Sequence, residues 1–125
     1  MLVFIDYSYN NFTHIKSILI NKNKPNTKII ELQKARSFEE KLERGMAQFD
    51  NKKYFLAIGN FKHALRYNQT DSLTNTYLAR AYYRMCRYKN QTCNEAILHA
   101  QKMLEANPES SIYRRLTEYY SKINN

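Results

Sequence analysis

The chain has 125 residues, with 20 Lys and Arg against 11 Asp and Glu, a formal net charge of +9 and 43% hydrophobic residues. This length fits one domain and is too short for two independent cores. Only two glycines and two prolines occur, which argues against turn-rich β sandwiches and barrels and favours helices. The positive charge is a weak signal of an acidic partner, because basic helical proteins need not bind nucleic acid.

The first twenty residues are the most hydrophobic part of the chain, but polar residues such as Asp6, Asn10 and Lys16 interrupt them. No stretch approaches the roughly 18 consecutive apolar residues that a transmembrane helix needs, so we expect no membrane span. The segment also lacks the basic start and the small-residue cleavage site of a signal peptide. With no targeting signal and only two cysteines, we expect a cytoplasmic protein.

In chain order, the apolar spacing first predicts a helix over about 12–19, while residues 1–10 have no assignment. A second apolar stripe covers 28–50. Ser37 and Glu40 form a capping box inside this stripe and place a helix start there. The pattern therefore leaves open whether one helix or two covers this segment.

An internal repeat is the most informative feature of the chain. Four positions match at an offset of 34 residues, each small residue to small residue or aromatic to aromatic. They are Gly45 with Ala79, Ala47 with Ala81, Phe49 with Tyr83 and Tyr54 with Tyr88. Further on the offset becomes 39, as in Ala57 with Ala96, so five extra residues lie between Tyr88 and Ala96. We expect them to lengthen the turn inside the second unit.

Each unit predicts two helices, because apolar residues recur three or four apart on either side of a short polar break. Thr92 with Glu95 forms a second capping box, which starts the second helix of the later unit. Pro108 ends that helix, since proline has no backbone N–H to donate. Ser110 or Ser111 then caps a last helix.

The order of these residues resembles the tetratricopeptide repeat (TPR) family, whose unit of about 34 residues has a small residue and an aromatic on its first helix and a tyrosine at the turn. The second helix of the family unit carries alanines and a phenylalanine, and a proline follows. The matching residues of the first unit are Gly45, Phe49, Tyr54, Ala57, Phe61, Ala64 and Leu65. Those of the second unit are Leu78, Ala79, Tyr82, Tyr83, Tyr88, Ala96, Ala100, Leu104 and Pro108. The resemblance covers about 38–120.

This resemblance implies an all-α fold in which antiparallel helical hairpins stack as a short, TPR-like right-handed superhelix. Small residues let paired helices approach closely, and aromatic residues fill the gaps between hairpins. Two repeats alone are marginal, so we expect a cap at each end. The single domain, 1–125, should comprise an N-terminal capping segment at 1–36, hairpins at 37–71 and 72–108, and a capping helix at 109–125.

The resemblance also implies a function, because the family places the first helix of each unit on a concave face. We expect a partly basic groove that binds another protein, through a peptide or helix with apolar and acidic side chains. Its arginines would meet the carboxylates. The candidate groove residues are Leu42, Met46, Phe49, Thr76, Arg80, Tyr83, Arg84, Ile112, Arg115 and Tyr119. The chain would then be an adaptor or scaffold.

Two other functions stay open. One is a chaperone for a secreted client, of the kind that some bacteria build from such hairpins, although those chaperones are usually acidic. The other is RNA binding, because basic and aromatic residues interleave around Tyr82, Tyr83 and Tyr88. We expect these tyrosines to pack inside the repeat and therefore do not expect nucleic acid as the partner. The apolar first twenty residues could equally cover a core or form a homodimer.

The sequence holds no pattern typical of an enzyme, a cofactor site or a metal site. His14, His63 and His99 fall on separate expected helices without carboxylates at catalytic spacing, so we expect surface or packing roles. Cys86 and Cys93 bracket the second turn and could be neighbours, but two thiols without further ligands are a poor zinc site. We favour free, buried cysteines over a disulfide.

Overall fold

The structure of the protein, a computed structural model, describes residues 27–123, and this part contains five α-helices and no β-strand. They are α2 (Thr27–Asp50), α3 (Tyr54–Tyr67), α4 (Ser72–Lys89), α5 (Cys93–Ala106) and α6 (Ser111–Ile123). The all-α prediction is confirmed for these residues. Within residues 27–123, no helix combines the length and the hydrophobicity that a membrane span requires. The helix predicted over 12–19 lies outside the described residues.

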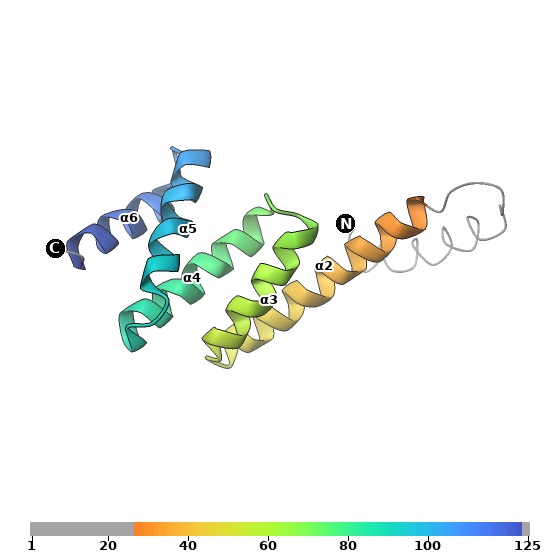
Figure 1. The fold of residues 1–125 in the computed structure, drawn as a ribbon, viewed down its shortest axis with the longest axis horizontal. Helices are drawn as coiled ribbons and strands as arrows, with labels where there is room; N and C mark the ends of the chain where they lie inside the picture. The colour runs from red at the N-terminus through yellow and green to blue at the C-terminus, as the bar shows by residue number, and fades with distance from the viewer. Residues whose placement is uncertain (1–26, 124–125) are drawn as a thin grey trace.

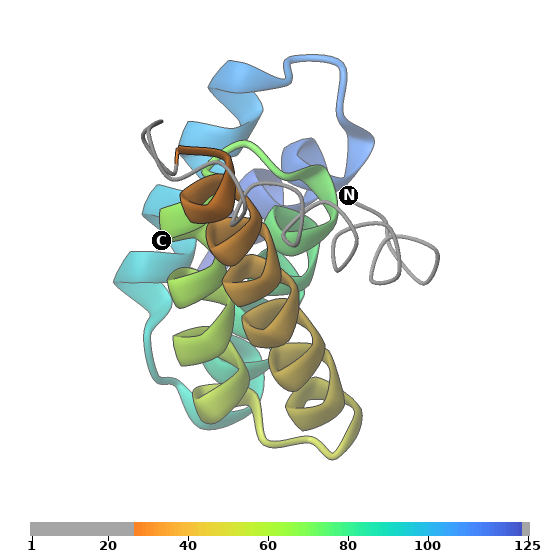
Figure 2. The same cartoon turned by 90° about the vertical axis from the view of Figure 1, so that its right-hand side faces the viewer.

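The helices follow one another as a row, and each packs mainly on its neighbours in the sequence (Figure 1). α2 and α3 are antiparallel and lie side by side (Figure 2). α3 then packs on α4, α4 on α5, and α5 on α6. The two short turns, 51–53 and 90–92, lie at the same end of the molecule, and the other two connections lie at the opposite end (Figure 1).

The core runs along the inner sides of the helices. It consists of Leu42, Ala57, Ile58, Phe61, Ala64, Leu78, Ala81, Tyr82, Met85, Cys86, Ala96, Ala100 and Tyr120. Its alanines are fully or almost fully buried, and their short side chains let neighbouring helices approach closely. Gly45 of α2 has the same effect, because it faces the fully buried ring of Phe61 on α3.

Helix α2 is continuous, which answers the question that the sequence left open for 28–50. Ser37 lies inside it, so the helix start predicted at the capping box of Ser37 and Glu40 is wrong. No glycine or proline interrupts α2 before Gly45, and the apolar stripe keeps its phase, so nothing in this stretch breaks the helix. Residues assigned to the capping segment and to the first hairpin thus share one helix.

The second turn is not enlarged, contrary to the prediction from the five extra residues. Residues 90–92 form a turn as short as the first one, and α4 instead continues to Lys89. Met85 and Cys86 extend the buried stripe of α4, so their burial favours further helix here. Asn90 ends the helix in a left-handed conformation, with a φ of 52°, and its backbone N–H donates to the Cys86 carbonyl.

Side chains cap two of the helix starts. The Asp71 carboxylate accepts hydrogen bonds from the backbone N–H of Thr74 at 2.9 Å and from the Thr74 hydroxyl at 2.6 Å, at the start of α4. The Ser110 hydroxyl accepts from the backbone N–H of Tyr113 at 3.3 Å, which confirms one of the two serines predicted to cap α6. α5 begins directly after Thr92, as predicted, although the Thr92 side chain makes no capping bond.

Candidate functional site

The ten predicted groove residues do not all lie on an open surface. Leu42 is buried in the core, and Met46 and Phe49 are partly buried against it. The other seven lie on α4 and α6. Six of these seven, all but Thr76, contribute to two adjoining features, a row of arginines on α4 and a hollow between α4 and α6.

The arginine face, which we define as Arg80, Arg84 and Arg87, presents three exposed guanidinium groups on α4. Spacings of four and three residues put them on one side of the helix. The Cζ atom of Arg80 lies 5.9 Å from the ring centre of Tyr77, and that of Arg84 lies 5.8 Å from the ring centre of Phe49. Stacking on a ring holds a guanidinium in place while its N–H edge can still meet a partner.

Arg84 contacts rings from two other helices. Its Cζ also lies 5.6 Å from the ring centre of Tyr54, and its Nη1 donates a hydrogen bond to the Tyr54 hydroxyl at 2.9 Å. The Phe49 ring meets Tyr54 edge to face at 5.2 Å and Tyr77 at 5.4 Å between centroids. Because these rings come from α2, α3 and α4, the cluster joins the first two helices to α4 and positions Arg84 upon them.

Arg87 was not among the predicted groove residues, although its position three residues after Arg84 was the available signal. Its Cζ lies 5.7 Å from the Tyr83 ring centre and 5.4 Å from the Tyr88 ring centre, and the Arg87 guanidinium donates a hydrogen bond to the Tyr83 hydroxyl.

Tyr82 is buried as predicted, but Tyr88 is 66% exposed, so the prediction that Tyr88 packs inside the repeat is wrong. The extension of α4 carries Tyr88 away from the turn position at which the repeat would bury it.

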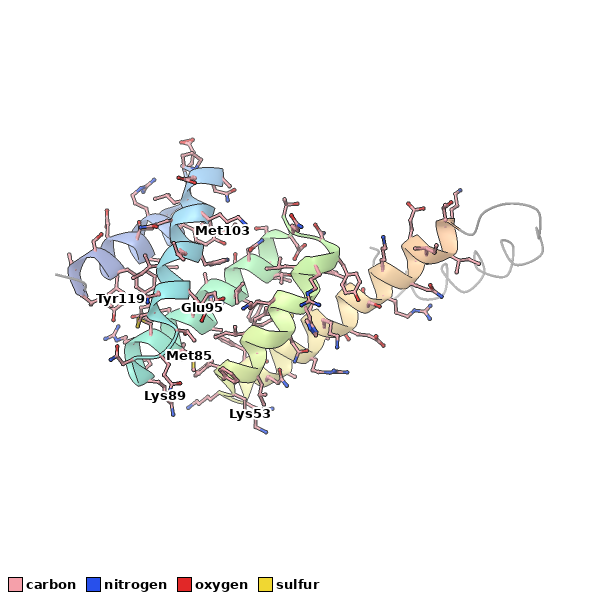
Figure 3. The ribbon with its side chains drawn as sticks, viewed as in Figure 1. Lys53, Met85, Lys89, Glu95, Met103 and Tyr119 are labelled. Atoms are coloured by element: carbon pink, nitrogen blue, oxygen red, sulfur yellow. A yellow bond between two sulfur atoms is a disulfide. The ribbon has the colours of Figure 1, made fainter. Side chains whose placement is uncertain are left out.

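A hollow of about 330 Å³ lies between α4 and α6, and its lining consists of Tyr83, Ile112, Arg115, Leu116 and Tyr119. The rings of Tyr83 and Tyr119 meet edge to face, 5.3 Å apart between centroids. Tyr119 lies on the last helix, at one end of the row (Figure 3). Leu116 is the one lining residue that the prediction missed. Because four of the five side chains are apolar or aromatic and the fifth is an arginine, the hollow suits an apolar side chain beside a carboxylate.

The arginines of this surface have no acidic partner among the described residues. In this part of the chain, the ion pair that forms joins Lys62 Nζ and Glu95 Oε2 at 3.6 Å, between α3 and α5. Thr76, a further groove candidate, is half-buried, and its hydroxyl donates to the Ser72 carbonyl at 2.8 Å. The surface therefore presents positive charge that is not neutralised by residues 27–123.

Cys86 and Cys93 form a disulfide, with their sulfur atoms 2.11 Å and their Cα atoms 4.7 Å apart. The prediction of free cysteines is therefore wrong. Cys86 lies one helical turn before the end of α4, and Cys93 begins α5, so the short turn brings the two side by side. Because the two cysteines are paired, they no longer support the expectation of a reducing compartment.

His99 is a packing residue between Tyr82 and Tyr113, with ring centroids 5.6 Å and 6.3 Å away. Its Nε2 lies 3.2 Å from Asn75 Oδ1. Because the Asn75 amide nitrogen donates to two backbone carbonyls, its oxygen accepts here and His99 Nε2 carries the proton. Burial and the nearby charge of Lys102 lower the pKa of His99 to about 4.

No group of three or more potential metal ligands occurs among the residues described.

Comparison with protein-family models, with curated proteins and with solved structures finds no match to this chain. The resemblance to tetratricopeptide repeats therefore stays a prediction from the internal repeat.

Proposed function

We propose that this protein is a protein-interaction module, an adaptor or scaffold that binds a peptide or helix with apolar and acidic side chains. The main support is that the arginine face adjoins the hollow between α4 and α6, because Tyr83 contacts the one and lines the other. Arg87 stacks on the ring of Tyr83, and the same ring lines the hollow. An apolar side chain in the hollow would thus lie beside a row of guanidinium groups.

The chemistry of the surface suits carboxylates in particular. An arginine presents several N–H donors in one plane and can bind both oxygens of a carboxylate at once. Arg80, Arg84 and Arg87 are held against rings, so less side-chain freedom is lost on binding. Arg115 adds a fourth cation at the hollow. A partner segment with an apolar anchor and neighbouring acidic residues matches this arrangement.

We propose further that the helices form a TPR-like, right-handed array, with hairpins α2–α3 and α4–α5 and with α6 as a cap. The offset of 34 residues supports this at two of its four matched pairs, whose members pack in similar ways. The pairs Ala47 with Ala81 and Tyr54 with Tyr88 differ in burial and add no support. Gly45 and its counterpart Ala79 are both buried small residues. Phe49 packs between the first hairpin and α4, and its counterpart Tyr83 packs between α4 and α6.

An affinity pull-down from native lysate, with and without nuclease, tests the binding function. We expect one protein to be retained after nuclease treatment and lost with the Arg80→Ala/Arg84→Ala variant. The matched control is Arg36→Ala/Arg44→Ala, which removes the same charge from exposed positions of α2. A partner that binds the Arg80/Arg84 variant as tightly as the unchanged chain would contradict the proposal. Thermal denaturation of each variant checks that it is folded.

RNA binding is the second candidate, because the exposed ring of Tyr88 carries the Arg87 guanidinium and could stack on a base. Recovery of RNA in the same pull-down, or loss of binding after nuclease treatment, would favour this function. A single aggregation-prone client that co-purifies with the chain would instead favour the chaperone function.

A cytoplasmic location is part of the proposal, and the disulfide is the main argument against it. Disulfides persist mainly in oxidising compartments. Alkylation of thiols in rapidly quenched cells tests the location. Free thiols at Cys86 and Cys93 in the cell would support the cytoplasm, and an oxidised pair would point to another compartment.

A further inference from the structure

A second surface lies at the end of the molecule where both short turns are found (Figure 1). Phe55 and Leu56, in the first turn of α3, are 67% and 51% exposed. Lys52, Lys53 and Lys89 lie around them. We call these five residues the lysine end. Large apolar side chains exposed next to one another, within a polar rim, are typical of an interaction surface.

Two hollows meet at Phe55 and Leu56. The smaller, of about 280 Å³, is lined by all five residues of the lysine end together with Tyr54, Met85 and Gln91, and by no acidic residue. Figure 3 shows Lys53, Met85 and Lys89 at this end of the molecule. Lysines from the first turn and from the end of α4 thus lie around one apolar pair.

The larger hollow, of about 500 Å³, continues from the same apolar pair along the outer side of α3. Its lining adds the cationic residues Lys41, Lys62 and Arg66. It contains one carboxylate, Glu95, and that carboxylate forms the ion pair with Lys62. Net positive charge therefore extends from the lysine end along α3.

We propose that the lysine end docks on an anionic lipid surface. Phe55 and Leu56 enter the boundary between headgroups and acyl chains, while Lys52, Lys53 and Lys89 lie among the lipid phosphates. The charges complement each other, and the long apolar stems of the lysines can lie along the apolar layer while their ammonium groups stay with the phosphates.

The kind of cation favours lipid over a protein partner at this surface. The arginine face holds planar guanidinium groups against rings, which suits carboxylates at fixed positions. The lysine end has ammonium groups, which are compact, strongly hydrated and free of any ring or carboxylate contact among the described residues. Ammonium groups on long side chains around Phe55 and Leu56 suit lipid phosphates, whose positions in a bilayer are not fixed. The lysine end shares no residue with the arginine face or with the hollow between α4 and α6, so this inference does not rest on the proposed function.

Flotation of the full chain with lipid vesicles tests the inference. We expect binding to vesicles made from an equal mixture of phosphatidylcholine and phosphatidylserine, and none to phosphatidylcholine alone. Raising the salt from low to physiological should weaken binding, because salt screens exposed charges. The Lys52→Glu/Lys53→Glu variant should bind at least about twentyfold more weakly, since each lysine near such a surface contributes about fivefold in affinity. Lys28→Glu/Lys34→Glu, at the far end of α2, makes the same charge change and should bind more tightly than that variant.

The apolar pair needs a separate variant. Phe55→Ser/Leu56→Ser should lose about tenfold in affinity, because less apolar surface enters the lipid. Its matched control is Leu73→Ser/Leu98→Ser, whose side chains are 50% and 66% exposed away from the lysine end and whose loss should leave binding unchanged. Circular dichroism and thermal denaturation verify that all variants fold.

The inference is overturned if the chain does not bind the mixed vesicles at low salt, or if the lysine and serine variants bind them like the unchanged chain. A protein or nucleic acid that is lost with these variants, while vesicle binding stays normal, would reassign the surface to that partner. The Arg80→Ala/Arg84→Ala variant should bind vesicles normally. The experiments therefore distinguish failure of the proposal for the arginine face from failure of the proposal for the lysine end.

Discussion

Gly45 faces Phe61 so closely that a Cβ atom added to the glycine would lie 2.6 Å from Cε1 of the ring and 2.7 Å from Cδ1. Phe61 is fully buried between α2 and its neighbours, so the ring has no free space to enter. We expect Gly45→Ala to lower the free energy of unfolding by about 1–3 kcal/mol through overpacking, even though alanine is the better helix former. Urea denaturation measures the change.

Gly59 provides the matched comparison, because it also lies inside a helix but has no atom within 4 Å of an added Cβ. Gly59→Ala should therefore raise the free energy of unfolding by up to about 1 kcal/mol, from helix propensity alone. Equal effects of the two substitutions would mean that α2 and α3 do not approach at Gly45 as described.

The neutral state of His99 predicts a loss of stability in acid. Its pKa falls from the ordinary 6.5 to about 4 in the folded protein, so the unfolded chain binds the proton more readily. Stability is complete above the unfolded pKa and decreases as the pH falls from 6.5 towards 4, by roughly 3 kcal/mol in total. Urea denaturation across this range should show the loss, and His99→Gln should remove it. An unchanged pH dependence in that variant would exclude His99 as the cause.

The Asp71 cap at the start of α4 gives a third prediction. Asp71→Ala removes the acceptor for both the backbone N–H and the hydroxyl of Thr74, a fully buried residue. We expect a loss of about 1–2 kcal/mol in the free energy of unfolding. Thr92 directly precedes α5 and makes no side-chain capping bond, so Thr92→Ala should cost clearly less. Similar losses for both substitutions would argue against the Asp71 cap.

The disulfide predicts that a reductant weakens the fold without abolishing it. Cys86 and Cys93 are seven residues apart, and a loop this short should contribute about 2–3 kcal/mol by restricting the unfolded chain. Reduction and the Cys86→Ser/Cys93→Ser variant should lower the melting temperature to a similar extent. Alkylation without reductant should leave both cysteines unmodified, and rapid labelling of either one would contradict the pairing.

Several helix boundaries could be predicted because local chemistry determines them. Pro108 cannot continue a helix, and Ser110 can cap the next one, so the passage from α5 to α6 was predicted correctly. Ser37 carries a similar local signal but lies within a continuous apolar stripe, and there the helix overrides the cap. The sequence pattern predicts the five extra residues in the turn, whereas the burial of Met85 and Cys86 shows that they lengthen α4.

The candidate site was predictable in its positions but not in its contacts. Helical phase placed Arg80 and Arg84 on one face, but the rings that hold Arg84 come from α2 and α3, and no spacing in the sequence reveals that. Leu42 looked equally suitable, because phase alone does not separate a groove from a core. The internal repeat does not single out Phe55 and Leu56, although both lie out of phase with the buried stripe of α3.

The packing of each helix mainly on its neighbours in the sequence affects how the chain folds. Contacts between neighbouring helices require the closure of short loops only, so little chain entropy is lost before the contacts form. We therefore expect fast folding, on the order of milliseconds or less. α3 and α4 are enclosed by helices on both sides, whereas α6 packs on α5 and meets α4 through Tyr119. Amide hydrogens of α6 should therefore exchange with solvent sooner than those of α3 and α4, and the chain should open from this end inwards.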